Sequence, residues 1–372
     1  MEKLIEFIMG IEDRRQEWKV AHKLKDIVVI VLLGTLANAD DWIEIEIFGQ
    51  KNERMLKKYI ELENGIPSHD TIQRVMGSIK PEVMKGLFEV WRKMCDEGEG
   101  ERIKKILNID GKRMRGSGNK NEEALHVVSA WSKEDGICFG QKAVREGSNE
   151  IVAIKELLEV IKVEGQIVTI DAIGTQKEIA KKIVEKKGDY VLAVKKNQEE
   201  KYEEIKTYFG DKSFLKRIEE EEIYVKTVEK AHGQIEKREY YQTRDVEWIY
   251  EKEKWEGLKS IGMVRTTINK EGEEKVEERY YISSLEGKAK EFEKAVRGHW
   301  AIESMHWHLD VTFREDANRT IEKRAAENMN IIRKWALGIL KMLDVGKKRS
   351  LKKKRFTISC DFEGFVETLL GM

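Results

Sequence analysis

Two aspartates stand at the ends of short apolar runs. Asp110 closes the run LNID and Asp171 closes VTID, and a glycine follows each of them within three positions. In a mixed sheet, ligands bind in the crevice at the carboxyl ends of parallel strands, so two parallel neighbours would direct both carboxylates into one site. Each aspartate alone is better explained as the cap of its own turn. The matching context of the two favours a shared site.

A third acid, Glu303, lies in the segment His299–Asp310, which reads HWAIESMHWHLD. On a helix that advances about 100° per residue, four polar side chains of this segment share one stripe roughly 60° wide. They are His299, Glu303, His306 and Asp310. A buried polar stripe has to be paired or bound to a metal. The alternative is a solvated helix face, which the flanking Trp300 and Trp307 disfavour.

Three carboxylates suit hard divalent cations, because Mg²⁺ and Mn²⁺ prefer oxygen ligands and keep waters that a phosphate can replace. Two such ions about 4 Å apart can activate a water or a 3′-hydroxyl and stabilise the leaving oxygen of an attack on a phosphodiester. Zinc is the alternative, but HExxH is absent and Cys95, Cys138 and Cys360 form no CxxC pair. The acids therefore predict chemistry that cuts or joins nucleic-acid strands.

The order of the expected elements predicts an α/β fold. Residues 1–100 have helical periodicity, with Ser68 as an N-cap. From residue 104 onward the pattern changes to three short strands, a helix, a strand, a helix and a strand, the order βββαβαβ of a mixed sheet. Strand-like runs after a charged helical stretch indicate a β-rich insertion at about 199–286, and long helices follow. We expect 101–345 to form one catalytic domain.

Composition excludes disorder but not a nucleic-acid partner. The 372 residues are 40% hydrophobic, and Lys+Arg and Asp+Glu balance at 69 each. This length accommodates two or three domains with cores, and DNA binding depends on where charge lies rather than on its sum. Between Lys347 and Arg355, seven of nine residues are basic. We expect 346–372 to be a basic C-terminal tail that binds phosphate or keeps the chain soluble.

The sequence predicts a cytoplasmic protein. Its one long apolar run, Ile27–Ala39, has 13 residues, whereas a membrane-spanning helix needs about 20. The first ten residues lack the basic start and apolar run of a signal peptide. Cysteines that stand far apart fit a reducing compartment.

Five ordered motifs resemble a known family. They are LNIDGKRMRGS at 107–117, SNEI at 148–151, VTIDAIGTQKEIAKKIVEKKGDYVLAVKKNQ at 168–198, AHGQIEKREYY at 231–241 and RGHWAIESMHWHLDVTFREDANR at 297–319. Together they closely resemble the H-repeat-associated (ISAs-type) transposases of bacterial insertion sequences, DDE enzymes of the ribonuclease-H-like fold. GIPSHDTIQRV at 65–75 resembles the helical domain associated with that family. The resemblance covers nearly the whole chain.

The resemblance implies a ribonuclease-H-like core with the β-rich insertion before its last acid, and an N-terminal domain that binds DNA. It makes Asp110, Asp171 and Glu303 the catalytic triad, holding Mg²⁺ or Mn²⁺, with two ions expected. It also implies a DNA transposase that cleaves at the ends of its element and transfers the strand.

One departure concerns the last motif. Many DDE transposases with such an insertion carry Tyr-x2-Arg-x3-Glu-x6-Lys, and here the three positions around Glu303 hold other residues, namely Val296, His299 and Asp310. We expect Arg297, His299 and His306 to approach the phosphate or to support Glu303.

The implied substrate is double-stranded DNA, at the terminal inverted repeats and at the target. Side chains near the acids are candidates to contact backbone phosphates: Lys112, Arg113, Arg115, Lys195, Lys196 and Asn197. For any single lysine, solvated loop charge is the simpler explanation. Because two element ends have to be brought together, we expect a homodimer by analogy. We expect no membrane partner, and we expect the protein to lie at the nucleoid.

Two other functions stay open. A stand-alone metal-dependent nuclease of the same fold would cut DNA without joining it, and a strand-transfer assay separates the two. A domesticated DNA-binding protein would keep the fold without the chemistry. That alternative predicts a lost acid, whereas Asp110, Asp171 and Glu303 are all present.

Overall fold

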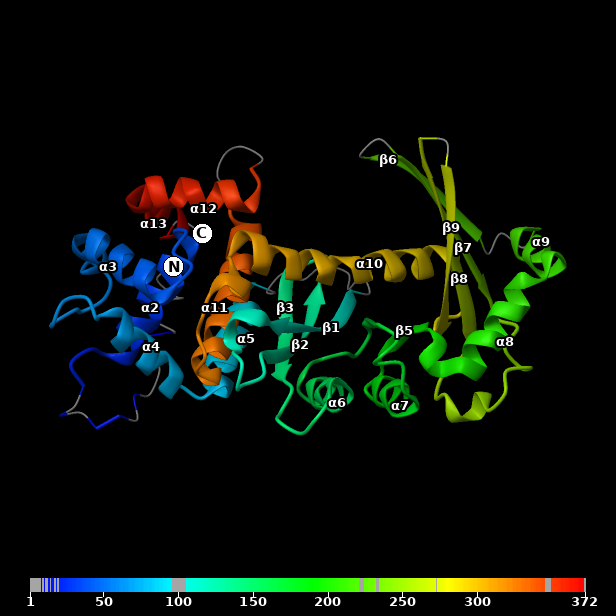
Figure 1. Cartoon of the computed structure of the whole chain (residues 1–372), viewed down its shortest axis with the longest axis horizontal. Helices are drawn as coiled ribbons and strands as arrows, with labels where there is room; N and C mark the ends of the chain where they lie inside the picture. Colours follow the sequence, from blue (N-terminus) through cyan, green and yellow to red (C-terminus); the bar gives the residue numbers. More distant parts are fainter. Residues whose placement is uncertain are drawn as a thin grey trace.

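A computed structural model describes residues 20–95, 105–220, 224–231, 234–271, 273–344 and 349–370, together with residues 8, 10, 13, 15, 16 and 18. The molecule is elongated: helices occupy one end, a mixed sheet the middle and long strands the other end (Figure 1). Among the described residues, no helix combines the length and the hydrophobicity needed to cross a membrane.

Four helices precede the sheet: α2 (Leu24–Leu36), α3 (Trp42–Leu56), α4 (His69–Ser78) and α5 (Pro81–Cys95). Ser68 caps α4 by accepting a hydrogen bond from the backbone amide of Thr71, which confirms the expected N-cap. Most of the apolar run Ile27–Ala39 lies in α2, whose side chains are almost all buried. These helices share one hydrophobic core with Trp131 and with helices near the C-terminus.

The expected order βββαβαβ is present. The strands are β1 (Ile106–Met114), β2 (Leu125–Ser132), β3 (Ile137–Ala143), β4 (Ile167–Ile170) and β5 (Asp189–Val194), and the two crossover helices are α6 (Glu150–Val160) and α7 (Lys177–Glu185). Strand β4 pairs in parallel with both β1 and β5, while β1–β2 and β2–β3 are antiparallel. Parallel pairing brings the middle of β1, at Ile109, beside the end of β4, at Ile170.

The predicted insertion contains α8 (Glu199–Gly210), α9 (Lys212–Glu220), β6 (Tyr224–Ala231), β7 (Gln234–Thr243), β8 (Ser260–Lys270) and β9 (Glu273–Ser283). Its strands do not form a sheet of their own. Leu192 of β5 pairs with Ile282 of β9, so the described strands make one nine-stranded sheet in the order β3-β2-β1-β4-β5-β9-β8-β7-β6. The insertion therefore extends the core sheet at its β5 edge.

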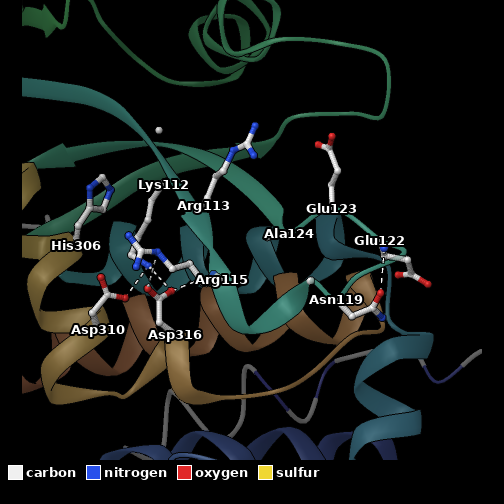
Figure 2. A pocket seen from close by; sticks show the side chains of 12 residues that line it. Lys112, Arg113, Arg115, Asn119, Glu122, Glu123, Ala124, His306, Asp310 and Asp316 are labelled. Carbon is white, nitrogen blue, oxygen red and sulfur yellow. Dashed lines mark hydrogen bonds and ion pairs between the residues drawn. The ribbon is translucent and has the colours of Figure 1, made fainter.

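Helix α10 (Ala289–Trp307) runs across the sheet and carries the last sequence motif (Figure 1). Ile302, Met305 and Leu309 of this motif are fully buried. The chain then turns through a π-helical segment, His308–Thr312, so that Asp310 and Asp316 face Lys112 of β1 (Figure 2). Helix α11 (Lys323–Met342) packs between the sheet and the N-terminal helices.

The prediction of a basic C-terminal tail at 346–372 is wrong for the part of it that the structure describes. Residues 349–370 contain α12 (Leu351–Cys360) and α13 (Phe362–Leu370). Arg355 is fully buried, donates to the carbonyl oxygen of Thr35 and pairs with Asp40 at 2.8 Å. The number of basic residues alone could not predict this burial. A guanidinium can be buried when carbonyl oxygens and a carboxylate accept its hydrogen bonds. Residues 345–348 lie outside the described part of the chain.

Candidate active site

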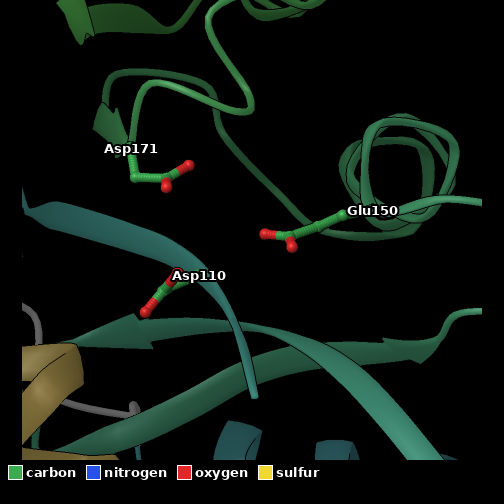
Figure 3. A group of neighbouring side chains, drawn as sticks. All are labelled: Asp110, Glu150 and Asp171. Carbon is green, nitrogen blue, oxygen red and sulfur yellow. The ribbon is translucent and has the colours of Figure 1, made fainter. Parts of the chain in front are cut away.

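Asp110, in the middle of β1, and Asp171, just after β4, meet where the parallel pairing of the two strands ends. Ile109 of β1 pairs with Ile170 of β4, and each aspartate is the next residue along the chain. Glu150, the first residue of α6, reaches the same place. One ligand oxygen from each of the three acids lies within 4.8 Å of the others (Figure 3). The sequence prediction of a shared site for the two aspartates therefore agrees with the backbone pairing.

Glu150 is the acid that sequence reasoning missed. Asn149 caps α6 by accepting a hydrogen bond from the amide of Val152, and this cap directs the first turn toward the aspartates. Gly111 lets the helix end approach, because a Cβ there would lie 2.7 Å from the carboxyl carbon of Glu150. The signal in the sequence is the motif SNEI, in which an acid follows an N-cap and opens an apolar helix.

The carboxylates raise one another's affinity for protons. Burial, and then the charges of Asp171 and Glu303, raise the pKa of Asp110 to about 6. Burial, and then the charges of Asp171 and Asp110, raise the pKa of Glu150 to about 7. Crowded carboxylates of this kind are relieved by protons or by a cation. Because all their donor atoms are oxygens, the site fits Mg²⁺ or Mn²⁺ rather than zinc.

Glu303 comes to the same crevice from another element. It is exposed on α10 and lines a cavity of about 550 Å³ together with Asp110, Asp171, Lys195 and His299. It does not belong to the tight group of three acids. The structure thus brings all three predicted acids to one crevice, and Glu150, but not Glu303, joins the group whose ligand atoms lie within 4.8 Å of one another.

His299 and His306, on the same helix as Glu303, reach toward the two aspartates. The Nδ1 atom of His299 is 3.0 Å from the hydroxyl of Thr169, whose strand β4 ends at Ile170, next to Asp171. The Nδ1 atom of His306 is 3.6 Å from an oxygen of Asp110. Burial lowers the pKa of His299 to about 4 and that of His306 to about 3, so both rings are neutral at pH 7.

Lys112 has a different role from the one expected. Its ammonium group lies 2.6 Å from Asp310, 3.3 Å from Glu315 and 3.2 Å from Asp316, and its side chain is only 11% exposed. Its charge is already neutralised, so Lys112 is a structural residue here. Arg113 and Arg115 are exposed and, together with Lys112, line a second cavity of about 690 Å³ (Figure 2).

The other side chains predicted to contact DNA are also of two kinds: some are exposed at a cavity, and others are bound to groups of the protein itself. Lys195 and Lys196 are exposed and line the crevice of the acids. Asn197 donates to the carbonyl of Ala172, which ties the turn after Asp171 to the end of β5. Arg297 pairs with Glu229 and lines a cavity on the other side of Trp300.

The family model of the Transposase DDE domain matches residues 100–339. This chain belongs to the DDE transposase family. A second family model, DDE_Tnp_1-associated, matches residues 5–92. The resemblance stated from the motifs is thereby confirmed, and the enzyme is a transposase.

Two relatives are similar in sequence to nearly the whole chain. YncI of Escherichia coli O157:H7 is 41% identical over 374 residues, covering 95% of this chain and 92% of its own. The H repeat-associated protein YhhI of Escherichia coli K12 is 38% identical over 369 residues, covering 95% of each chain. Both have the word transposase in their names. A piggyBac transposase in a synaptic complex with hairpin DNA is 13% identical, with a TM-score of 0.39 over all of this chain and 81% of its own, too distant to support an argument.

Proposed function

We propose that this enzyme cleaves DNA at the terminal inverted repeats of a bacterial insertion sequence and transfers the freed strand to a target. The observation that carries the proposal is the convergence of Asp110, Asp171 and Glu303 on one crevice, in a chain of the DDE transposase family. The parallel strands β1 and β4 and the crossing helix α10 support a ribonuclease-H-like core.

In this proposal the catalytic acids hold Mg²⁺ or Mn²⁺, two ions in all. Asp110, Asp171 and Glu150 are close enough to share one ion, and Glu303 is the acid nearest the open side of the crevice. Bound divalent ions would activate the attacking water or 3′-hydroxyl and stabilise the leaving oxygen. Thr169 donates to Asn108 and so links the two strands that precede the aspartates, and the neutral rings of His299 and His306 leave the charge of the acids free for the metal.

The DNA backbone has candidate contacts on both sides of the acids. We assign phosphate contacts to Arg113 and Arg115 on one side and to Lys195 and Lys196 on the other, because all four are exposed beside the crevice or its neighbouring cavity. The helical region within residues 1–100 is proposed to bind the element ends. Joining two ends requires two active sites, which supports a homodimer at the nucleoid.

The proposal is tested with a duplex that carries the inverted repeat bordering the gene, with Mg²⁺ and a target plasmid. The variants Asp110→Asn, Asp171→Asn and Glu303→Gln should each lose cleavage by more than 100-fold while still binding the duplex. Glu164→Gln is the matched control, because Glu164 is exposed and pairs with Lys187 away from the crevice. Full cleavage by the three variants would contradict the assignment.

The same assay separates the alternatives. Cleavage without strand joining would identify a metal-dependent nuclease, and binding without cleavage would identify a domesticated DNA-binding protein.

Glu150 needs a second readout. In the absence of DNA, Glu150→Gln should weaken Mn²⁺ binding measured by calorimetry more than Glu303→Gln does, because Glu150 lies in the tight group of acids. The reverse order would remove Glu150 from the ligand set.

A further inference from the structure

The polar side chains of the last sequence motif contact both strands that lead to the catalytic aspartates. We call these four residues the polar stripe: His299, Glu303, His306 and Asp310. The Nδ1 atom of His299 lies 3.0 Å from the hydroxyl of Thr169 on β4, and that of His306 lies 3.6 Å from Asp110 on β1. Glu303 comes between the two histidines in the chain, is exposed and lines the crevice of the acids. The other members of the polar stripe therefore hold the helix that carries Glu303.

Asp310, the last member of the polar stripe, is joined to β1 by an ion pair. The ammonium group of Lys112 lies 2.6 Å from its carboxylate (Figure 2). Lys112 follows Asp110 by two positions, so the two side chains project from the same face of β1. Asp310 follows Glu303 by seven positions, about two helical turns, so these two lie on the same side of the helical segment. The ion pair thus links the strand of one catalytic acid to the helix of another.

Both partners of this ion pair are held firmly. The side chain of Lys112 is only 11% exposed, and its ammonium group also lies 3.3 Å from the buried Glu315 and 3.2 Å from Asp316. On the other side, the π-helical segment that contains Asp310 follows α10 without a break, because the backbone stays helical at Trp307 and His308. A displacement of Asp310 is therefore passed on to α10 and to Glu303.

We propose that Asp310 is a positioning residue for Glu303. Its ion pair with Lys112 fixes α10 against β1, so that Glu303 and Asp110 face the same divalent ions across the crevice. Such a contact matters for the rate, because a displacement of about 1 Å at a reacting centre can slow an enzyme about 100-fold. This inference rests on the proposed function, since it concerns how the metal site of that function is assembled.

Two asparagine variants test the positioning role. Asp310→Asn and Asp316→Asn each remove one carboxylate charge from the surroundings of Lys112, but only Asp310 belongs to the polar stripe. In Asp316→Asn, the amide oxygen can still accept from the backbone amide of Arg115. With saturating inverted-repeat duplex and Mg²⁺, Asp310→Asn should slow cleavage about tenfold to 100-fold at unchanged DNA affinity. Asp316→Asn should cleave nearly as fast as the wild type, and Asp310→Glu, which keeps the charge, should recover most of the rate.

Manganese binding measured by calorimetry without DNA shows whether Asp310 acts through Glu303. Asp310→Asn should weaken Mn²⁺ binding by no more than Glu303→Gln does. The double variant should bind Mn²⁺ as Glu303→Gln alone does, because a misplaced ligand that is already absent cannot be lost again.

The two measurements separate this inference from the proposed function. Equal cleavage by Asp310→Asn and Asp316→Asn, or additive losses of Mn²⁺ binding in the double variant, would overturn the positioning role and leave the proposed function standing. Failure of the wild type both to cleave and to bind Mn²⁺ would overturn the two together.

Discussion

At the scale of single residues, the carboxylates of the active site are placed to bind a cation. Without a cation, their closeness lowers the stability of the folded protein. Asp110, Glu150 and Asp171 are held close together by β1, α6 and β4, and burial raises the pKa of the first two carboxyl groups. The same folded structure that assembles the ligands therefore opposes their ionisation. A site of this kind gains stability when a divalent ion binds.

The first prediction concerns the metal-free protein. The folded pKa of Glu150 is about 7, above its ordinary value of 4.5. The folded state thus holds this proton more tightly than the unfolded state, and its stability decreases as the pH rises through this range. In EDTA at pH 8, Glu150→Gln should stabilise the protein by on the order of 1–3 kcal/mol.

Chemical denaturation at pH 5 and pH 8 checks this prediction. The gain should be small at pH 5 and should disappear at pH 8 when Mn²⁺ is added, because the ion then neutralises the wild-type carboxylate. Glu164→Gln, on the surface, is the control. A destabilising effect of Glu150→Gln in EDTA would contradict the account.

A second prediction separates a structural cation from one available to DNA. Lys112→Gln leaves three carboxylates without their shared partner and should destabilise the protein by about 3 kcal/mol. Arg115→Gln should change stability by less than about 0.5 kcal/mol, because its side chain is 86% exposed. Arg115→Gln should instead weaken DNA binding and lower its salt dependence. Urea denaturation and binding at several salt concentrations measure the two effects.

At the scale of elements, the sequence predicted the strands and helices that are determined by the local pattern of apolar and polar residues. The alternation of strands and helices predicted β1 to β5 in order, and helical periodicity predicted the helix α10 that carries Glu303. Two features depended on contacts between distant segments and were missed. Glu150 joins the aspartates only because α6 begins at the end of the sheet. The C-terminal helices were taken for a tail because the partners of Arg355 lie more than 300 residues away.

The third prediction concerns how α12 is anchored. Arg355→Leu removes the partner of Asp40 and leaves the buried carbonyl of Thr35 without its donor. Loss of a buried, hydrogen-bonded cation should cost about 3 kcal/mol. Lys353→Gln is the control, because Lys353 is an exposed cation two positions earlier on the same helix. Equal stability of the two variants in urea denaturation would show that α12 does not depend on this contact.

At the scale of the whole molecule, buried polar contacts join the N-terminal helical region to α11 and to the segment that precedes it. Trp42 donates to Thr320 at 2.8 Å, and the carbonyl of Asp40 accepts from Asn318 at 2.9 Å and from Arg333 at 3.1 Å. The hydrophobic core also continues from α2 into α11. The helical region that we propose to bind the element ends is thus in direct contact with segments that lead from α10.

The fourth prediction follows from this continuity. The N-terminal helices and the sheet should unfold in a single transition, because neither can expose the shared core alone. Far-ultraviolet circular dichroism and tryptophan fluorescence should give the same midpoint in urea, measured on the full chain. Two separated transitions would show that the helical region is an independent domain.

The most direct test of the central claim is the position of bound manganese. Crystals of the wild-type enzyme soaked in Mn²⁺ should show anomalous density between Asp110 and Asp171, within coordination distance of Glu150 or Glu303. Manganese bound elsewhere, with these carboxylates free, would contradict the proposal that they form the metal site of a transposase.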